Sequence, residues 1–96
     1  MTPPGDIIIT HNAAENRYEA TVEGKICVAE YVIKSDRMIF THTFVPVELR
    51  GRGIAEKIVR AALADARAQK LKVTPACSYV ARFIDRHPEY GDLVAT

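Results

Sequence analysis

The 96-residue chain has no tryptophan, two cysteines and three histidines, and these shortages exclude several kinds of small domain. The cysteines, Cys27 and Cys77, lie far apart and form no Cys-x-x-Cys pair. A small domain held by disulfides or built around zinc needs more numerous or more closely spaced cysteines and histidines. We therefore expect two free thiols and no metal site.

The chain also lacks an excess of charge and a long apolar run. Thirteen Lys and Arg face twelve Asp and Glu, so no overall field attracts nucleic acid or membrane lipid. The acidic Glu48 and Glu56 lie beside the arginines at positions 50, 52, 60 and 67, which disfavours a nucleic-acid-binding domain built on those arginines. No stretch approaches the ~20 apolar residues of a membrane span, and the start carries no cationic and apolar leader. We expect a cytoplasmic monomer or weak dimer with no membrane or nucleic-acid partner.

Alternating apolar residues and turn residues predict four strands in the first half of the chain. We place these strands at residues 7–10, 17–22, 25–34 and 37–45, after six residues that look loose. The third strand is apolar on both alternating faces, so we expect it to be central and covered on both sides. Simple alternation places Phe40, His42 and Phe44 on one face of the fourth strand. Pro46 has no amide hydrogen and should end the pairing.

Helical spacing follows from residue 52 to about residue 69. Six apolar residues fall on one stripe of this helix: Ala55, Ile58, Val59, Ala62, Leu63 and Ala66. A short strand at residues 71–74 and a second helix from residue 78 or 79 to residue 86 complete the chain, with Ser78 as the N-cap and His87-Pro88 as the stop. The order ββββ-α-β-α predicts a single α+β domain over residues 1–96, with a sheet that is not wholly parallel.

The segment from Arg50 to Ala55, Arg-Gly-Arg-Gly-Ile-Ala, joins the fourth strand to the first helix. Glycine leaves backbone amides accessible, and a helix N-terminus adds unpaired N–H groups and the positive end of a dipole. Such a turn can hold a phosphate, with the two arginines as charged partners. The same residues also fit a glycine-bearing N-cap with solvated arginines. The glycine spacing matches neither the mononucleotide loop nor the dinucleotide fingerprint.

The spacing Arg-x-x-Gly-x-Ala, after a strand that ends in Val-Pro-Val and before a long amphipathic helix, resembles the acetyl-CoA pyrophosphate loop of GNAT acetyltransferases. The segments THTFVPVELRGRGIAEKIV and TPACSYVARFIDRHPEY extend the likeness over residues 25–90, to the very small single-domain branch of that superfamily. The resemblance implies a predominantly antiparallel five-stranded sheet whose fourth and fifth strands splay apart around the pantetheine arm. The contacts with acetyl-CoA that it implies are Phe44, Val45, Val47, Arg50, Gly51, Arg52, Gly53, Ile54 and Ala55.

One departure concerns the acceptor. Larger GNAT enzymes have helices after the first strand that help to build the acceptor pocket, whereas here a short turn joins the first two strands. The acceptor site is therefore open, shared with a partner, or absent.

Three residues are candidates for the chemistry of acetyl transfer. Cys77 directly precedes a helix, where a thiol can have a lowered pKa, although a free cysteine is more often a small buried apolar side chain. His42 could reach across the splayed strands toward Cys77 as a base, or could be a core histidine. Tyr79 could return a proton to the CoA thiolate, as a tyrosine does in many GNAT enzymes, or could simply pack. Cys27, in mid-strand, is assigned to the core.

The sequence thus supports two hypotheses about function. The first is an acetyltransferase that moves an acetyl group from acetyl-CoA to an unidentified amine, directly or through an acetyl-Cys77 intermediate. The alternative is a non-catalytic module that binds CoA or acyl-CoA and acts with a partner.

Overall fold

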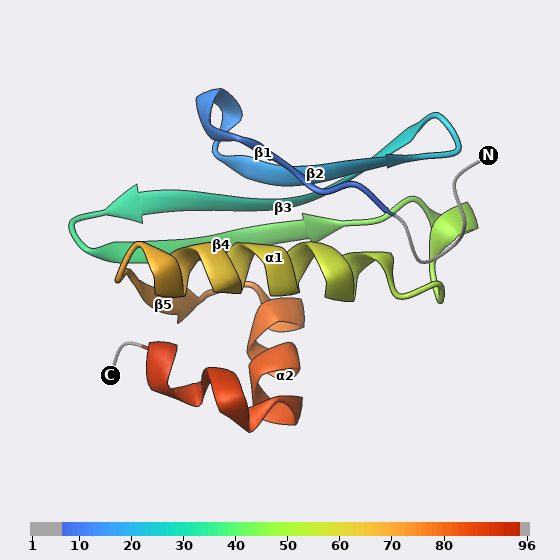
Figure 1. The fold of residues 1–96 in the computed structure, drawn as a ribbon. Helices are drawn as coiled ribbons and strands as arrows, with labels where there is room; N and C mark the ends of the chain where they lie inside the picture. The colour runs from blue at the N-terminus through green and yellow to red at the C-terminus, as the bar shows by residue number, and fades with distance from the viewer. Residues whose placement is uncertain (1–6, 95–96) are drawn as a thin grey trace.

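A computed structural model describes residues 7–94, and within them the chain follows the predicted order ββββ-α-β-α (Figure 1). The strands are β1 Thr10–Asn12, β2 Arg17–Val22, β3 Lys25–Lys34, β4 Arg37–Phe44 and β5 Lys72–Pro75. The helices are α1 Ile54–Ala68 and α2 Ser78–Arg86, with the short 3-10 helices η1 Ala13–Glu15, η2 Val47–Leu49 and η3 Pro88–Leu93. The first six residues, which the sequence predicts to be loose, lie outside the described range. No helix in residues 7–94 is long and apolar enough to cross a membrane.

The five strands form one sheet in the order β1-β2-β3-β4-β5. Successive strands from β1 to β4 pair antiparallel, and β5 returns parallel to β4 after the α1 crossover. The predicted α+β fold, with a predominantly antiparallel sheet, is confirmed. Pairing between β4 and β5 ends at Phe40 and Pro75, although β4 continues to Phe44. The two strands therefore separate, as expected.

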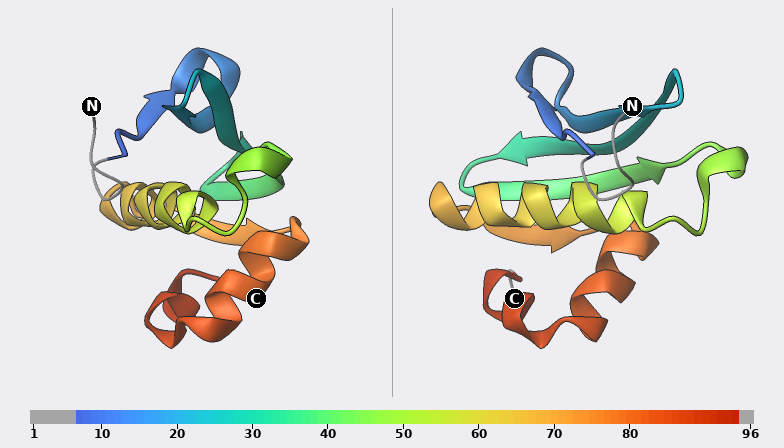
Figure 2. Two further views of the ribbon diagram at one scale, coloured as in Figure 1. Left: turned by 90° about the vertical axis from the view of Figure 1, so that its right-hand side faces the viewer. Right: turned by 45° about the vertical axis from the view of Figure 1, so that its right-hand side comes forward.

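Helix α1 covers one face of the sheet, which we call the inner face (Figure 2). The buried stripe of α1 consists of Ile54, Ile58, Val59, Ala62, Leu63 and Ala66. It packs on an inner-face set of Tyr18, Ala20, Cys27, Ala29, Tyr31, Met38, Phe40 and Val73. Burial of this apolar surface is the main force that holds helix and sheet together. The predicted stripe is confirmed apart from Ala55, which is half-buried and lines a pocket.

Helix α2 and η3 lie beyond the β5 edge of the sheet, beside α1 (Figures 1 and 2). The predicted end of α2 at Arg86 is confirmed, and of the two expected starts the helix takes Ser78. Its N-cap is therefore Cys77, and the prediction of Ser78 as the N-cap is wrong. Arg67 of α1 donates to Asp92 of η3 over 2.8 Å, and this bond links the C-terminal end of α1 to η3.

The opposite, outer face of the sheet carries no helix within residues 7–94 (Figure 2). Ile26 and Val32 of β3 point to this face and are 48% and 44% exposed. The expectation that β3 is covered on both faces is therefore wrong for the outer face. The reason is topological, because the single crossover helix covers the inner face and α2 passes beyond the sheet edge.

A β-bulge in β4 changes which side chains share a face. Tyr31 of β3 pairs with Phe40, but the preceding Glu30 pairs with His42, so Thr41 is an extra residue in β4. Neighbouring residues of β3 point to opposite faces, and so do their partners Phe40 and His42. The expectation that Phe40, His42 and Phe44 share a face is wrong. His42 and Phe44 lie on the outer face, and Thr43 takes the inner position.

The first strand also differs from its prediction. β1 covers Thr10–Asn12 instead of residues 7–10, because His11 is held opposite Tyr18. Its imidazole stacks on the Tyr18 ring at 4.2 Å and is hydrogen-bonded through Nε2 to the Tyr31 hydroxyl. The Asn12 side chain then accepts a hydrogen bond from the Glu15 amide and starts η1. The connection between the first two strands is thus as short as predicted.

Candidate ligand pocket and reactive cysteine

Two glycines shape the turn between η2 and α1. Gly51 has φ +83° and Gly53, the N-cap of α1, has φ +76°, a region that side-chain-bearing residues rarely adopt. A Cβ placed on either residue would meet nothing within 4 Å. The glycines are therefore required by the backbone conformation, and they leave open space beside the backbone.

The amides in this turn have no internal partners. Within residues 7–94, the backbone N–H groups of Gly51 through Glu56 donate to no protein acceptor, whereas Lys57 donates to the Gly53 carbonyl over 3.2 Å. Amides of a helix N-terminus that remain free carry the positive end of its dipole. The turn therefore presents a row of donors suited to an anion.

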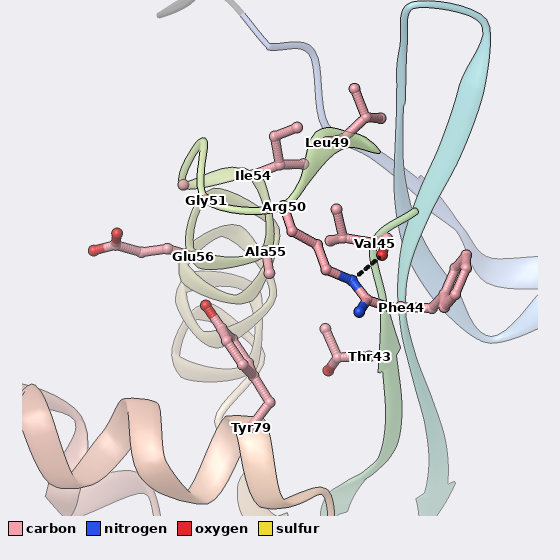
Figure 3. A pocket seen from close by; sticks show the side chains of 11 residues that line it. Thr43, Phe44, Val45, Leu49, Arg50, Gly51, Ile54, Ala55, Glu56 and Tyr79 are labelled. Atoms are coloured by element: carbon pink, nitrogen blue, oxygen red, sulfur yellow. Dashed lines mark hydrogen bonds between the residues drawn. The ribbon is translucent and has the colours of Figure 1, made fainter. Parts of the chain in front are cut away.

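The two arginines of the turn have different environments. Arg50 lies between α1 and β4, where its Nε donates to the Val45 carbonyl over 2.9 Å and leaves the remaining guanidinium N–H groups exposed (Figure 3). Arg52 forms an ion pair with Glu23 and donates to the Glu48 carbonyl. Only Arg50 lines the adjoining pocket. Arg52 is engaged on the other side of the loop.

A pocket of about 380 Å³ opens beside this turn (Figure 3). It is lined by Thr43, Phe44, Val45, Leu49, Arg50, Gly51, Gly53, Ile54, Ala55, Glu56 and Tyr79. Of the nine contacts expected for acetyl-CoA, seven line this pocket. Arg52 and Val47 do not, and Val47 is 70% exposed.

One wall of the pocket is the end of β4. Beyond Phe40, β4 has no strand partner on its β5 side, because the chain leaves β5 at Pro75 and the Cys77 amide makes the last bond, to the Phe40 carbonyl at 2.8 Å. The edge of β4 from Thr41 to Phe44 is thus open to an extended ligand. It leads from the glycine turn toward Cys77.

Cys77 does not line the pocket itself, but it contacts Thr43, which does. Its Sγ is 3.4 Å from the Thr43 hydroxyl oxygen. Partial burial raises the pKa of the thiol, but the Thr43 hydroxyl and the backbone amides of Val80 and Tyr79 outweigh burial and lower the pKa of Cys77. These amides make no capping hydrogen bond of ordinary geometry, so they act on the sulfur through their dipoles. Cys77 therefore combines partial exposure with an increased thiolate fraction.

Cys27 differs from Cys77 in its burial and in the direction of its pKa shift. It is fully buried on the inner face, and burial raises the pKa of its thiol. The assignment of Cys27 to the core is confirmed, and both cysteines are free.

Tyr79 closes the pocket from the first turn of α2. Its side chain points toward α1 (Figure 3), and burial together with the charge of Glu56 raises the pKa of its phenol, partly offset by Arg86. The phenol therefore keeps its proton at neutral pH. Glu56, in the first turn of α1, is balanced by Arg60, whose Nη2 lies 3.1 Å from the carboxylate.

His42 does not face Cys77. The bulge places its ring on the outer face, where it stacks near Phe44 at a centroid distance of 6.5 Å. The inner position that His42 was expected to occupy belongs to Thr43. Simple alternation missed Thr43, and no feature of the sequence marks the bulge that brings it to the sulfur.

Comparisons with known proteins show the family and two relatives. The sequence model of the GCN5-related N-acetyl-transferase family matches residues 17–93. Protein NATD1 of Mus musculus is 31% identical, over 91% of this chain and 87% of its own length. Protein NATD1 of Xenopus tropicalis is 28% identical, over 92% of this chain and 84% of its own.

A solved structure has the same fold. The solution structure of a GCN5-like protein from Staphylococcus aureus superposes with a TM-score of 0.74, covers 92% of this chain and 87% of its own, and is 23% identical. At that identity the likeness concerns the fold alone.

Proposed function

Because the chain belongs to the GCN5-related N-acetyltransferase family, we propose that its pocket binds acetyl-CoA and that the acetyl group passes to an amine. The observation that carries the proposal is the continuous path from the free amides at the start of α1, along the open edge of β4, to Cys77. A pyrophosphate fits the row of amides and an extended pantetheine amide chain fits the strand edge. The thioester would then lie near Thr43 and Cys77.

The phosphate end of the ligand is held by this chain's backbone. The amides from Gly51 to Glu56 are free to donate to an anion, and Arg50 adds a charge from the pocket wall. The Glu56 carboxylate is a negative charge nearby, and its ion pair with Arg60 reduces the repulsion. The one other charged side chain among the lining residues, Arg50, is cationic and therefore suits a phosphate.

Two routes are compatible with the site. In the direct route, an unprotonated amine attacks the thioester carbon, the carbon–sulfur bond breaks, and Tyr79 donates its proton to the departing CoA thiolate. The ammonium formed on the product nitrogen loses a proton to water or His42. In the two-step route, the Cys77 thiolate attacks first and releases CoA, and the amine then attacks the acetyl-cysteine and restores the thiol.

The alternative is a module that binds CoA without chemistry and acts with a partner. The open acceptor side is the feature that favours it, because no described element forms a second pocket wall beyond the sheet. The two functions share the ligand and differ in whether the acetyl group leaves CoA.

Time-resolved mass spectrometry of the intact protein with acetyl-CoA separates these possibilities. The two-step route predicts an acetyl adduct on Cys77 together with CoA release, and the Cys77→Ser variant should lack both. The direct route predicts CoA release only when an amine is present, in wild type and variant alike. CoA binding without either product supports the alternative, and the absence of CoA binding contradicts both.

A further inference from the structure

The approach of an acceptor to the pocket is limited to one side of β4. On the inner side, α1 and Tyr79 close the space around the β4 edge. On the outer side, no helix or strand of residues 7–94 covers the end of the sheet (Figure 2). Since the edge from Thr41 to Phe44 is unpaired, a group bound along it is accessible from the outer face. This inference rests on the proposed function.

The outer face has a distinct composition next to this edge. We call the set Ile26, Val28, Glu30, His42 and Phe44 the acceptor face. Its members come from β3 and β4, and the pairs Val28–Phe44 and Glu30–His42 lie side by side in the register. Ile26 is 48% and Phe44 43% exposed. Apolar side chains thus surround one carboxylate and one imidazole.

Phe44 joins the acceptor face to the pocket. It lines the pocket, yet its ring points away from α1 toward the outer side (Figure 3). Thr43, one residue earlier, points to the inner side and meets Cys77. The acceptor face therefore begins where the thioester would lie.

Glu30 differs from the other carboxylates of this part of the sheet. Glu19, Glu23 and Glu48 form ion pairs with Arg17, Arg52 and Lys25. Glu30 forms none within residues 7–94, and its neighbour Arg17 on β2 is already bound to Glu19 over 2.7 Å. A carboxylate left without its own partner beside apolar side chains attracts a cation with an aliphatic stem.

We propose that the acceptor face binds a polypeptide segment and brings one of its lysine side chains to the thioester. The ammonium group is attracted by Glu30 and loses a proton to water before the amine attacks the thioester, and flanking apolar side chains of the segment pack on Ile26 and Phe44. A small free amine finds no enclosing walls on this open surface, whereas an extended segment gains contact along it. The acceptor is therefore a protein lysine and not a small metabolite amine.

Peptide binding to the CoA-loaded protein tests the proposal without relying on catalysis. The probe is a fluorescein-labelled peptide of ~8 residues, long enough to span the face, with a central lysine between leucine and phenylalanine. We expect saturable binding by anisotropy, and a loss of at least fivefold in affinity for Ile26→Ser. The matched control is Val32→Ser, on the same strand and face and 44% exposed, but ~20 Å further along β3. It should bind normally.

The charge is tested with a second peptide in which norleucine replaces lysine. Glu30→Gln should weaken the lysine peptide severalfold and leave the norleucine peptide unaffected. The proposal is overturned if Ile26→Ser and Val32→Ser change the peptide affinity equally or not at all. It is also overturned if Glu30→Gln weakens the binding of both peptides. Acetylation of spermidine at least as efficiently as the lysine peptide, or a dimer in sedimentation that hides the face, would overturn it as well. Failure of the proposed function appears separately, as a protein that binds no CoA.

Discussion

At the scale of single residues, Thr43 is one of the groups that lower the pKa of Cys77. Its hydroxyl is 3.4 Å from the sulfur, on the inner face that the bulge at Thr41 assigns to it. A hydroxyl that donates to a thiolate stabilises the charged form, which is one of the causes that lower the pKa of Cys77. Thr43 is therefore a positioning residue, and its effect can be measured on the thiol itself.

We predict that Thr43→Val moves the iodoacetamide labelling profile of Cys77 to higher pH. Loss of one hydrogen bond to a charged sulfur should slow labelling at pH 6 by roughly three- to tenfold. Thr43→Ser, which keeps the hydroxyl, should label like wild type. Peptide mass spectrometry reads both, with the buried Cys27 as an internal reference that labels only on unfolding. Identical profiles for all three proteins would remove Thr43 from the account.

The arginines of the turn offer a second test at this scale. Arg50 lines the pocket and keeps free N–H groups, whereas Arg52 is bound to Glu23. Arg50→Gln should therefore weaken CoA binding by roughly three- to tenfold, the value of one exposed charge on a phosphate. Arg52→Gln should change it less than twofold. Calorimetry compares them, and a larger effect of Arg52→Gln would contradict the placement of the anion.

At the scale of elements, the glycine turn and α1 form one unit. Gly53 has φ +76° and is the N-cap, so any side chain there strains the backbone and takes up open space next to the turn. Gly24, in the β2–β3 turn, also has φ +76°, and a Cβ there also meets nothing within 4 Å. The two glycines therefore differ mainly in their distance from the pocket.

We predict that Gly53→Ala reduces CoA affinity at least tenfold, while Gly24→Ala leaves it unchanged. Both should lower the free energy of unfolding by ~1 kcal/mol, because alanine pays the same penalty at positive φ. Denaturant unfolding provides the stability values and calorimetry the affinities. If both variants bind CoA normally despite the shared loss of stability, the turn does not hold the ligand.

Much of this element-scale structure was predictable from the sequence. The bounds of β2 and β3 and the end of α2 agree with the prediction, because alternation and turn residues mark both ends of these strands and a proline stops the helix. β1 was misplaced, because the apolar run at residues 7–9 suggests a strand, whereas the stacking of His11 on Tyr18 decides the register. The bulge was missed, because Thr41 has no residue type that signals it.

The candidate site was predictable to a similar extent. Glycine spacing located the turn, and the helix start located Cys77, since both are local signals. The side chains that meet Cys77 depend on the face of β4 that each residue occupies, and one inserted residue exchanges His42 for Thr43. Which β4 side chain contacts Cys77 depends on the register between β3 and β4, and local sequence patterns do not reveal that register.

At the scale of the whole molecule, the near balance of charges makes anion binding a local property. With a formal net charge of +1, the chain has no long-range field to gather a polyanion. Binding of CoA then depends on the free amides and Arg50, which act over short distances, and on apolar contacts with the pantetheine arm.

We predict that CoA affinity falls by roughly three- to tenfold between ~0.05 M and ~0.5 M salt, because screening weakens the phosphate contacts and not the apolar ones. Calorimetry at the two ionic strengths measures it. Pantetheine, which lacks the phosphates, is the control and should bind weakly with little dependence on salt. An affinity for CoA that is independent of salt would mean that the phosphates lie away from the turn.

The most direct test of the central claim is the change in backbone amide chemical shifts when ¹⁵N-labelled protein is titrated with CoA. The account predicts that the largest changes fall on the amides of Gly51 through Glu56, which have no acceptor within residues 7–94, with smaller changes along Thr41 to Phe44 and at Cys77. The amides of β1 and β2 should not move. Large changes elsewhere with an unperturbed turn, or no changes at saturating CoA, would contradict it.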